Sequence, residues 1–237
     1  MTAKASSAEA YESLKRLMED SHNRELKCRE YLKHAKYLLF REQVIEFKYV
    51  ETEYRGHSGD SDYVISGTVR LEQGYECVKA YVWELKTPQC YIFEKDNENR
   101  VCPTKDLVKA ENQLLHYYHE NKGKEEFRKE FGVTHSDNVC LGGIIIGTGS
   151  RKINGDYEED KKKKLYEKAM TIRNLYFYNP HGIRLMTWDN VLEHLKARTE
   201  SSRRFDGTGI FNMSTIPRGS IPVWIDSEGR LWGERPP

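Results

Sequence analysis

The stretch SDYVISGTVRLEQGYECVKAYVWELK, residues 61–86, contains two segments in which apolar and polar side chains alternate, joined by Glu-Gln-Gly at 72–74. Such alternation is typical of half-buried β-strands. A three-residue loop with glycine in the left-handed third position is a common hairpin connection. The sequence therefore predicts an antiparallel hairpin whose paired residue numbers sum to 146, so that Tyr63 faces Trp83.

This register gathers charged side chains at the open end of the hairpin. Asp62 lies directly across from Glu84, and Lys86 follows on the same face; a two-residue loop would instead send Asp62 to the opposite face. Opposed carboxylates repel each other. A lysine offsets this repulsion, and a divalent cation offsets it further, because Mg²⁺ takes one or two protein carboxylates and keeps several waters. These three residue types around a metal suit phosphodiester hydrolysis.

The Glu-x-Lys spacing by itself indicates little, because it recurs along the chain. It is also present at Glu25/Lys27, Glu46/Lys48, Glu120/Lys122 and Glu159/Lys161. Glu46/Lys48 lies on a predicted strand, but it has no aspartate opposite it and no proline after the strand. An ion pair at a sheet edge is the alternative interpretation of Glu84/Lys86. Under the catalytic interpretation, we expect alanine at either position to abolish cleavage and leave the fold intact.

The remaining periodicity predicts an α/β fold with a mixed sheet flanked by helices. Helices are expected at about 6–19, 24–39, 106–120, 158–176 and 188–197, and further strands at 44–54, 139–147 and 182–187. VCLGGIIIG at 139–147 is a continuous apolar run, as expected of a buried central strand. In the helix at 158–176, we expect Leu165, Ala169 and Ile172 to share the buried face.

Composition narrows the cellular setting. The chain has 237 residues, with 38 basic and 37 acidic side chains, so any polyanion site must come from local clustering. Its five cysteines show no C-x-x-C spacing, which argues against a disulfide framework or a structural zinc site. We find no apolar run long enough to cross a membrane and no signal-peptide pattern at the N-terminus. We therefore expect a cytoplasmic protein.

The order Asp62, then Glu84-Leu85-Lys86, then Gln113 is similar to the D…ExK…Q order of the PD-(D/E)xK nuclease superfamily. More narrowly, the chain resembles the Shedu family of bacterial anti-phage nucleases over about 24–196. The family's ELK-P strand is followed by an A-x-x-Q-L-x-x-Y helix, and the matching helix positions here are Ala110, Gln113, Leu114 and Tyr117. The segment GIRLMTWDNVLEHL is similar to the family's T-Y-D-x-L pattern, with Trp188 in place of the usual tyrosine. In the helix with the A-x-x-Q pattern, Glu111-Asn112 before Gln113 is a second departure from the family.

The resemblance implies a restriction-endonuclease-like core and a Mg²⁺-dependent deoxyribonuclease, with Mn²⁺ as a substitute, that acts on phage or plasmid DNA. Asp62 and Glu84, with the Leu85 carbonyl, would hold the metal. Lys86 would handle the attacking water, Gln113 would orient Lys86 or the water, and Glu25 is a further candidate ligand. The implied organisation is a helical extension at 1–40, a nuclease domain at 41–197 and a tail at 198–237 with a hairpin at 221–232. The resemblance and the helical N-terminus also lead us to expect that copies of the chain assemble into an oligomer.

Two alternatives stay open: a catalytically silent module of the same fold that binds nucleic acid or assembles, and an RNA-directed or repair nuclease. The glycines of GGIIIGTGSRK lack the Gly-Lys-Ser/Thr ending of a phosphate loop. The lysines at 161–164 follow three acidic residues, an order that suits a helix dipole. Candidate contacts to nucleic acid are Arg198, Arg203 and Arg204 in the tail, and His57, His116 and His119.

Overall fold

The structure is a computed structural model that describes residues 7–20, 25–51, 54–56, 59–61, 63–98, 100–204, 224–225 and 231–232. The chain divides into two compact units, residues 1–199 and 200–237, and each is considered by itself. Asp62 and His57 lie outside the described residues.

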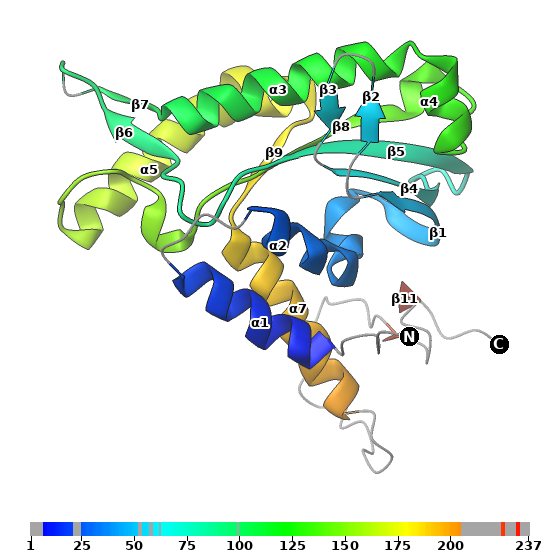
Figure 1. Ribbon diagram of the computed structural model, residues 1–237, viewed down its shortest axis with the longest axis horizontal. Coiled ribbons are helices and arrows are strands. Elements are labelled where there is room, and N and C mark those ends of the chain that lie inside the picture. Colours follow the sequence, from blue (N-terminus) through cyan, green and yellow to red (C-terminus); the bar gives the residue numbers. More distant parts are fainter. Residues whose placement is uncertain are drawn as a thin grey trace. The chain divides into compact units, whose positions relative to one another are not determined.

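The first unit is built on a five-stranded sheet in the order β1-β4-β5-β8-β9 (Figure 1). The strands are β1 (Gln43–Glu51), β4 (Tyr63–Arg70), β5 (Glu76–Leu85), β8 (Val139–Ile145) and β9 (Arg184–Met186). The first three form the predicted antiparallel meander, and β8 and β9 add to β5 in parallel. The predicted class, α/β with a mixed central sheet flanked by helices, is confirmed.

The hairpin of β4 and β5 has the predicted register. Tyr63 pairs with Trp83. At the turn, the Leu71 N–H donates to the Tyr75 carbonyl at 2.8 Å, and Gly74 has a φ of 82°. A positive φ is the conformation that glycine adopts without steric cost. The three-residue loop is therefore confirmed, and it fixes which face every side chain of the two strands occupies.

Helices cover both faces of the sheet (Figure 1). On one face, α3 (Lys105–Lys122) packs across β5 and β8, with α4 (Glu125–Glu130) and α5 (Glu159–Arg173) alongside. On the other lie α1 (Ser7–Glu19), α2 (Glu25–Arg29) and α7 (Trp188–Arg204). Two separate apolar clusters result. Val82 belongs to the α3 side, and Trp83, one residue further, belongs to the α1 and α7 side.

Two predicted helices differ from the structure. After α2 the chain continues as 3-10 turns, η1 (Glu30–His34) and η2 (Lys36–Leu39), because Ala35 leaves helical geometry and its N–H closes a tighter turn on Leu32. The expectation that Ile172 is buried is wrong, since it is 51% exposed. Ile172 lies in the last turn of α5, and the next buried side chain along the chain is Tyr178, in the π-helical turn η5 (Asn174–Tyr178) that leads to α6 (Asn179–His181).

Two short hairpins were not predicted: β2 (Tyr54–Gly56) with β3 (Gly59–Ser61), and β6 (Phe93–Lys95) with β7 (Val101–Pro103). The 3-10 turns η3 (Ser136–Asn138) and η4 (Gly149–Arg151) flank β8. In the second unit, β10 (Trp224–Ile225) pairs with β11 (Leu231–Trp232), within the segment predicted as a hairpin. In the described part of the chain, none of the helices combines the length and apolarity that crossing a membrane requires.

Candidate functional site

The predicted acid and base form a buried ion pair at the end of the central strand β5. The Lys86 Nζ lies 2.6 Å from the Glu84 Oε1, and the side chains are 12% and 0% exposed, respectively. Glu46 and Lys48 form the same kind of pair on β1, but there the side chains are 62% and 42% exposed. Exposed pairs contribute about 0–1 kcal/mol, whereas buried charges are retained only with close partners. Burial therefore separates Glu84/Lys86 from its equivalent on β1.

The backbone at Lys86 is held from two sides. Its N–H donates to the Ile145 carbonyl at 2.8 Å, which continues the parallel pairing of β5 with β8 beyond the last strand residue. Its carbonyl accepts a 2.7 Å hydrogen bond from the Trp188 Nε1. The Trp188 side chain is fully buried at the start of α7. The position of Lys86 therefore depends on a residue about 100 positions away in the sequence.

Trp188 positions the backbone of Lys86 through this hydrogen bond. The sequence pattern did not predict this contact, because the family pattern has a tyrosine at the position of Trp188. A signal was present: a buried indole N–H usually requires an acceptor. The neighbouring residues fix the start of the helix in the same way. The Thr187 N–H donates to the Asn190 side chain at 2.9 Å, and the Asp189 carboxylate accepts from the Gly149 N–H at 2.6 Å.

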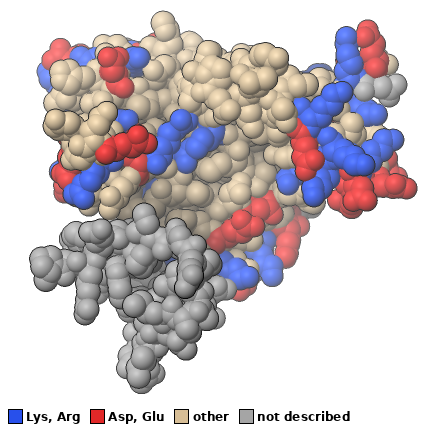
Figure 2. All heavy atoms as spheres, turned by 180° about the vertical axis from the view of Figure 1, so that it is seen from behind, with Lys and Arg blue, Asp and Glu red and all other residues tan. Residues whose placement is uncertain are grey.

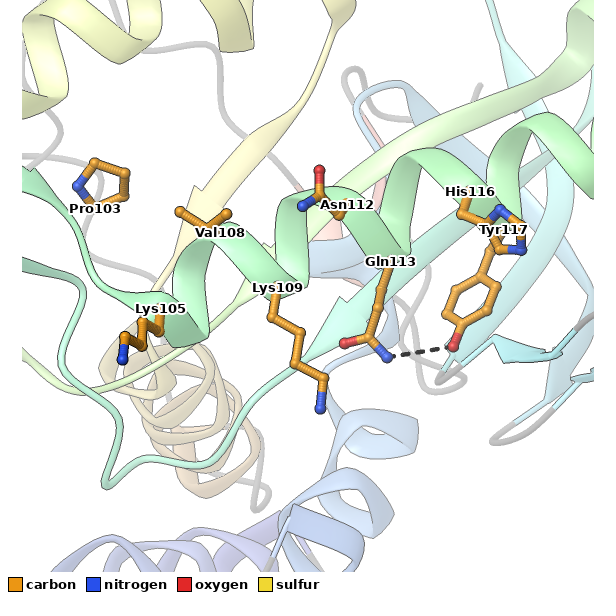
Figure 3. A pocket seen from close by; sticks show the side chains of 8 residues that line it. All are labelled: Pro103, Lys105, Val108, Lys109, Asn112, Gln113, His116 and Tyr117. Carbon is orange, nitrogen blue, oxygen red and sulfur yellow. Dashed lines mark hydrogen bonds between the residues drawn. The ribbon is translucent and has the colours of Figure 1, made fainter.

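Glu84 and Gln113 lie on the same side of the sheet. Side chains alternate along a strand, so Glu84 points to the same face as Val82, which packs in one cluster with Ala110 and Leu114 of α3. Gln113 is next to Leu114 on this helix, and its Nε2 donates to the Tyr117 hydroxyl at 3.4 Å (Figure 3). The Gln113 Oε1 is buried and has no hydrogen-bond partner among the described residues.

A buried oxygen without a donor costs about 1–3 kcal/mol. The carboxamide oxygen of Gln113 is therefore ready to accept a hydrogen bond from a bound molecule or a water. This feature fits the predicted role of Gln113 in orienting a water or Lys86, and that role stays a prediction.

An open groove of about 570 Å³ runs along α3 and reaches Gln113 and Tyr117 (Figure 3). Its remaining lining residues come from the same helix and the strand before it: Pro103, Lys105, Val108, Lys109, Asn112 and His116. His116 is exposed in this groove and His119 is exposed on the same helix. The groove joins the position of Gln113 to the N-terminal end of α3.

The second predicted metal ligand, Asp62, lies outside the described residues, but the segments on both sides of it are placed. Tyr63 follows it in β4, opposite Trp83, and β3, which ends at Ser61, contacts both α3 and β5. Glu25 begins α2, and its side chain lies outside the described part of the structure. Among the described residues no group of three or more His, Cys, Asp or Glu side chains could hold a metal.

Fewer protein ligands suffice for Mg²⁺, which is bound through one or two carboxylates and several waters. Glu84 supplies one such carboxylate at the end of β5, and Asp62, which lies outside the described residues, is the predicted second one. The hard oxygen donors of this end of the hairpin therefore fit Mg²⁺ or Mn²⁺ better than a metal that prefers thiolate or imidazole.

A second buried carboxylate, Glu111, lies on α3 on the side of α5. Glu111 is 5% exposed, accepts a 2.7 Å hydrogen bond from the Tyr178 hydroxyl, and lies 3.5 Å from the Arg173 guanidinium. Burial raises the pKa of Glu111 above its usual range, although the hydrogen bond from Tyr178 and the charge of Arg173 oppose this rise. These contacts join α3 to α5 and to the π-helical turn.

The other candidate residues are placed as follows. Arg198 donates to the His34 carbonyl at 3.3 Å and stacks over the Tyr37 ring, so it contributes to packing of the first unit. Arg203 and Arg204 lie in α7, and their side chains are outside the described part. In the glycine-rich segment after β8, the Gly147 N–H donates to the Thr87 carbonyl at 3.1 Å.

When the chain is compared with models of protein families and with curated proteins, neither comparison finds a match. The functional assignment therefore depends on the geometry of the site and on the order of its motifs.

Proposed function

We propose that this protein is a metal-dependent nuclease that hydrolyses phosphodiester bonds of DNA. The observation that carries the proposal is the buried Glu84–Lys86 pair at the end of the central strand, on the face covered by the helix that holds Gln113. The confirmed hairpin register supports it, because the prediction that Asp62 faces Glu84 depends on this same register.

The roles of the side chains follow from their chemistry. Glu84 and Asp62 would hold a Mg²⁺ ion, which polarises a phosphoryl oxygen and acidifies a bound water. A lysine ammonium has three donors, so Lys86 can contact Glu84 and the attacking water or a phosphate oxygen at once. Its positive charge stabilises the negative charge that develops on the phosphate. The Gln113 oxygen would accept a hydrogen bond from the same water.

The order Asp62, Glu84-x-Lys86 and Gln113 further supports assignment to the PD-(D/E)xK superfamily, and we propose the Shedu family of anti-phage nucleases as the closest fit within it. The substrate would then be phage or plasmid DNA. All five cysteines are free, which suits the reducing cytoplasm proposed as the site of action.

The test is incubation of purified protein with supercoiled plasmid, linear DNA and RNA, each with Mg²⁺, with Mn²⁺ and with EDTA. We expect metal-dependent DNA cleavage that Glu84→Gln and Glu84→Gln/Lys86→Met each abolish. Glu46→Gln and Lys48→Met are matched controls, because they remove the same ion pair from an exposed strand position; both should cut like the parent. Cleavage of RNA alone would favour the RNA-directed alternative, and binding without cleavage would favour the silent module.

A further inference from the structure

We propose that one stripe of α3, formed by Lys105, Lys109, Gln113 and Tyr117, binds the phosphodiester backbone of the DNA strand that enters the site. This inference rests on the proposed nuclease function and adds the path of the substrate. The two lysines would contact phosphates, and Gln113 would mark the end of the path next to Glu84 and Lys86.

The spacing of these residues makes them a straight row. They are four residues apart, so they share one helix face, and each step along the axis is about 6 Å. The close-up view shows Lys109, Gln113 and Tyr117 projecting to the same side of α3 (Figure 3). All four line the groove of about 570 Å³. The row therefore leads from the first turn of α3 to the buried acceptor of Gln113.

Among the described residues, no acidic side chain pairs with the two lysines of this row. Lys105 and Lys109 are exposed, and in the described part of the chain neither forms an ion pair. By contrast, Lys129 of α4 pairs with Glu125 at 2.7 Å, and Lys162 of α5 pairs with Glu159 at 3.2 Å. Lys105 also occupies the first turn of its helix, where the macrodipole favours acidic side chains. A local electrostatic cost of this kind is expected at functional positions.

On the part of the surface that Figure 2 colours, basic and acidic side chains lie interspersed. Lysines that contact phosphates position a nucleic acid without reading its sequence. The groove also exposes Val108 and the rings of His116 and Tyr117, and aromatic rings beside a basic track stack on bases or sugars. Phosphate contact at the lysines and ring contact near Gln113 match a nucleic-acid strand better than a free anion.

The proposal predicts a specific salt dependence of binding. Fluorescence anisotropy would measure the affinity of a labelled oligonucleotide, as a single strand and as a duplex, over a range of salt concentrations in EDTA. The slope of log K against log [salt] is negative, and each lost phosphate contact makes it less steep by about 0.7 for single strands and about 0.9 for duplex DNA. Lys105→Gln/Lys109→Gln should therefore make the slope less steep by about 1.4 for a single strand and about 1.8 for a duplex, and Lys109→Gln alone by half as much.

The matched control is Lys164→Gln/Lys168→Gln, which removes two exposed lysines with the same spacing from α5. Its slope should equal that of the parent. A slope unchanged by Lys105→Gln/Lys109→Gln, an equal reduction in the control, or no DNA binding by the parent would overturn the proposed track. If the parent cuts DNA and the slope is unchanged, only the track fails. If the slope falls as expected and no nucleic acid is cut, the track stands and the nuclease function fails.

Discussion

Replacing Lys86 by methionine should destabilise the protein strongly, because it leaves the fully buried Glu84 carboxylate without its lysine. Breaking a buried ion pair from one side costs about 3–5 kcal/mol. We therefore expect a loss of this size, about 3–5 kcal/mol, or roughly 6–20 °C in Tm for a chain of this length.

The companion variants test the physical cause. Glu84→Gln should cost less than Lys86→Met, because the remaining lysine is 12% exposed and reaches water. Glu84→Gln/Lys86→Met should recover most of the stability, since it leaves no buried charge. The assay is urea denaturation followed by tryptophan fluorescence at pH 7. Lys48→Met, the exposed counterpart, should change the free energy of unfolding by at most about 1 kcal/mol.

A loss below about 1 kcal/mol for Lys86→Met at pH 7 would refute this reasoning, because it is the value of an exposed pair. The expected loss also changes how activity data are interpreted. The sequence led us to predict that alanine at either position would leave the fold intact, whereas the burial of Glu84 predicts a loss of stability for substitutions that leave one charge behind. Loss of cleavage should therefore be judged in the double variant, or in Glu84→Gln, at a temperature where the protein is shown to be folded.

Three further predictions concern the metal, the positioning residue and the buried carboxyl of α3. Mg²⁺ should raise the Tm of the parent according to RT ln(1 + [Mg²⁺]/Kd), and Asp62→Asn should remove most of this shift; an equal shift in both would locate the ion elsewhere. Trp188→Phe keeps an aromatic ring and loses the hydrogen bond to the Lys86 carbonyl. The kcat for cleavage should therefore fall about tenfold or more, with KM unchanged. An unchanged kcat would show that Trp188 does not position the site. Burial raises the pKa of Glu111 above the ordinary 4.5, so the folded state favours its protonated form. The free energy of unfolding should therefore fall as pH rises from about 4.5 through the folded pKa. Glu111→Gln should abolish this fall, as measured by denaturation between about pH 4 and pH 8.

The hairpin register could be predicted because it depends on local chemistry. Gly74 allows the left-handed residue that closes the three-residue loop, and from that turn the pleat determines the face of each following side chain. The buried run at 139–147 was equally local, since a strand covered on both faces has to be apolar throughout. The second strand of the hairpin and this apolar run pair with each other as β5 and β8 in the sheet.

Features that depend on tertiary contacts could not be predicted in the same way. The spacing of Ile172 predicts a buried position, but Ile172 is exposed, and Tyr178, in the π-helical turn that follows α5, enters the core. The bond from Trp188 to the Lys86 carbonyl joins residues 102 positions apart. No local pattern specifies such a contact.

The two Glu-x-Lys pairs on strands show what the fold adds to a motif. On a strand, residues two apart point to the same face, so ion pairing follows from the spacing, and both Glu46/Lys48 and Glu84/Lys86 form it. Pairing therefore does not distinguish a catalytic site from a surface salt bridge. The distinction comes from burial, because the Glu84 side chain is 0% exposed, on the sheet face that packs against α3, and the Glu46 side chain is 62% exposed. A carboxylate in that environment interacts more strongly with any cation that reaches it, which is the property a phosphodiester hydrolase requires and an exposed pair on an edge strand lacks.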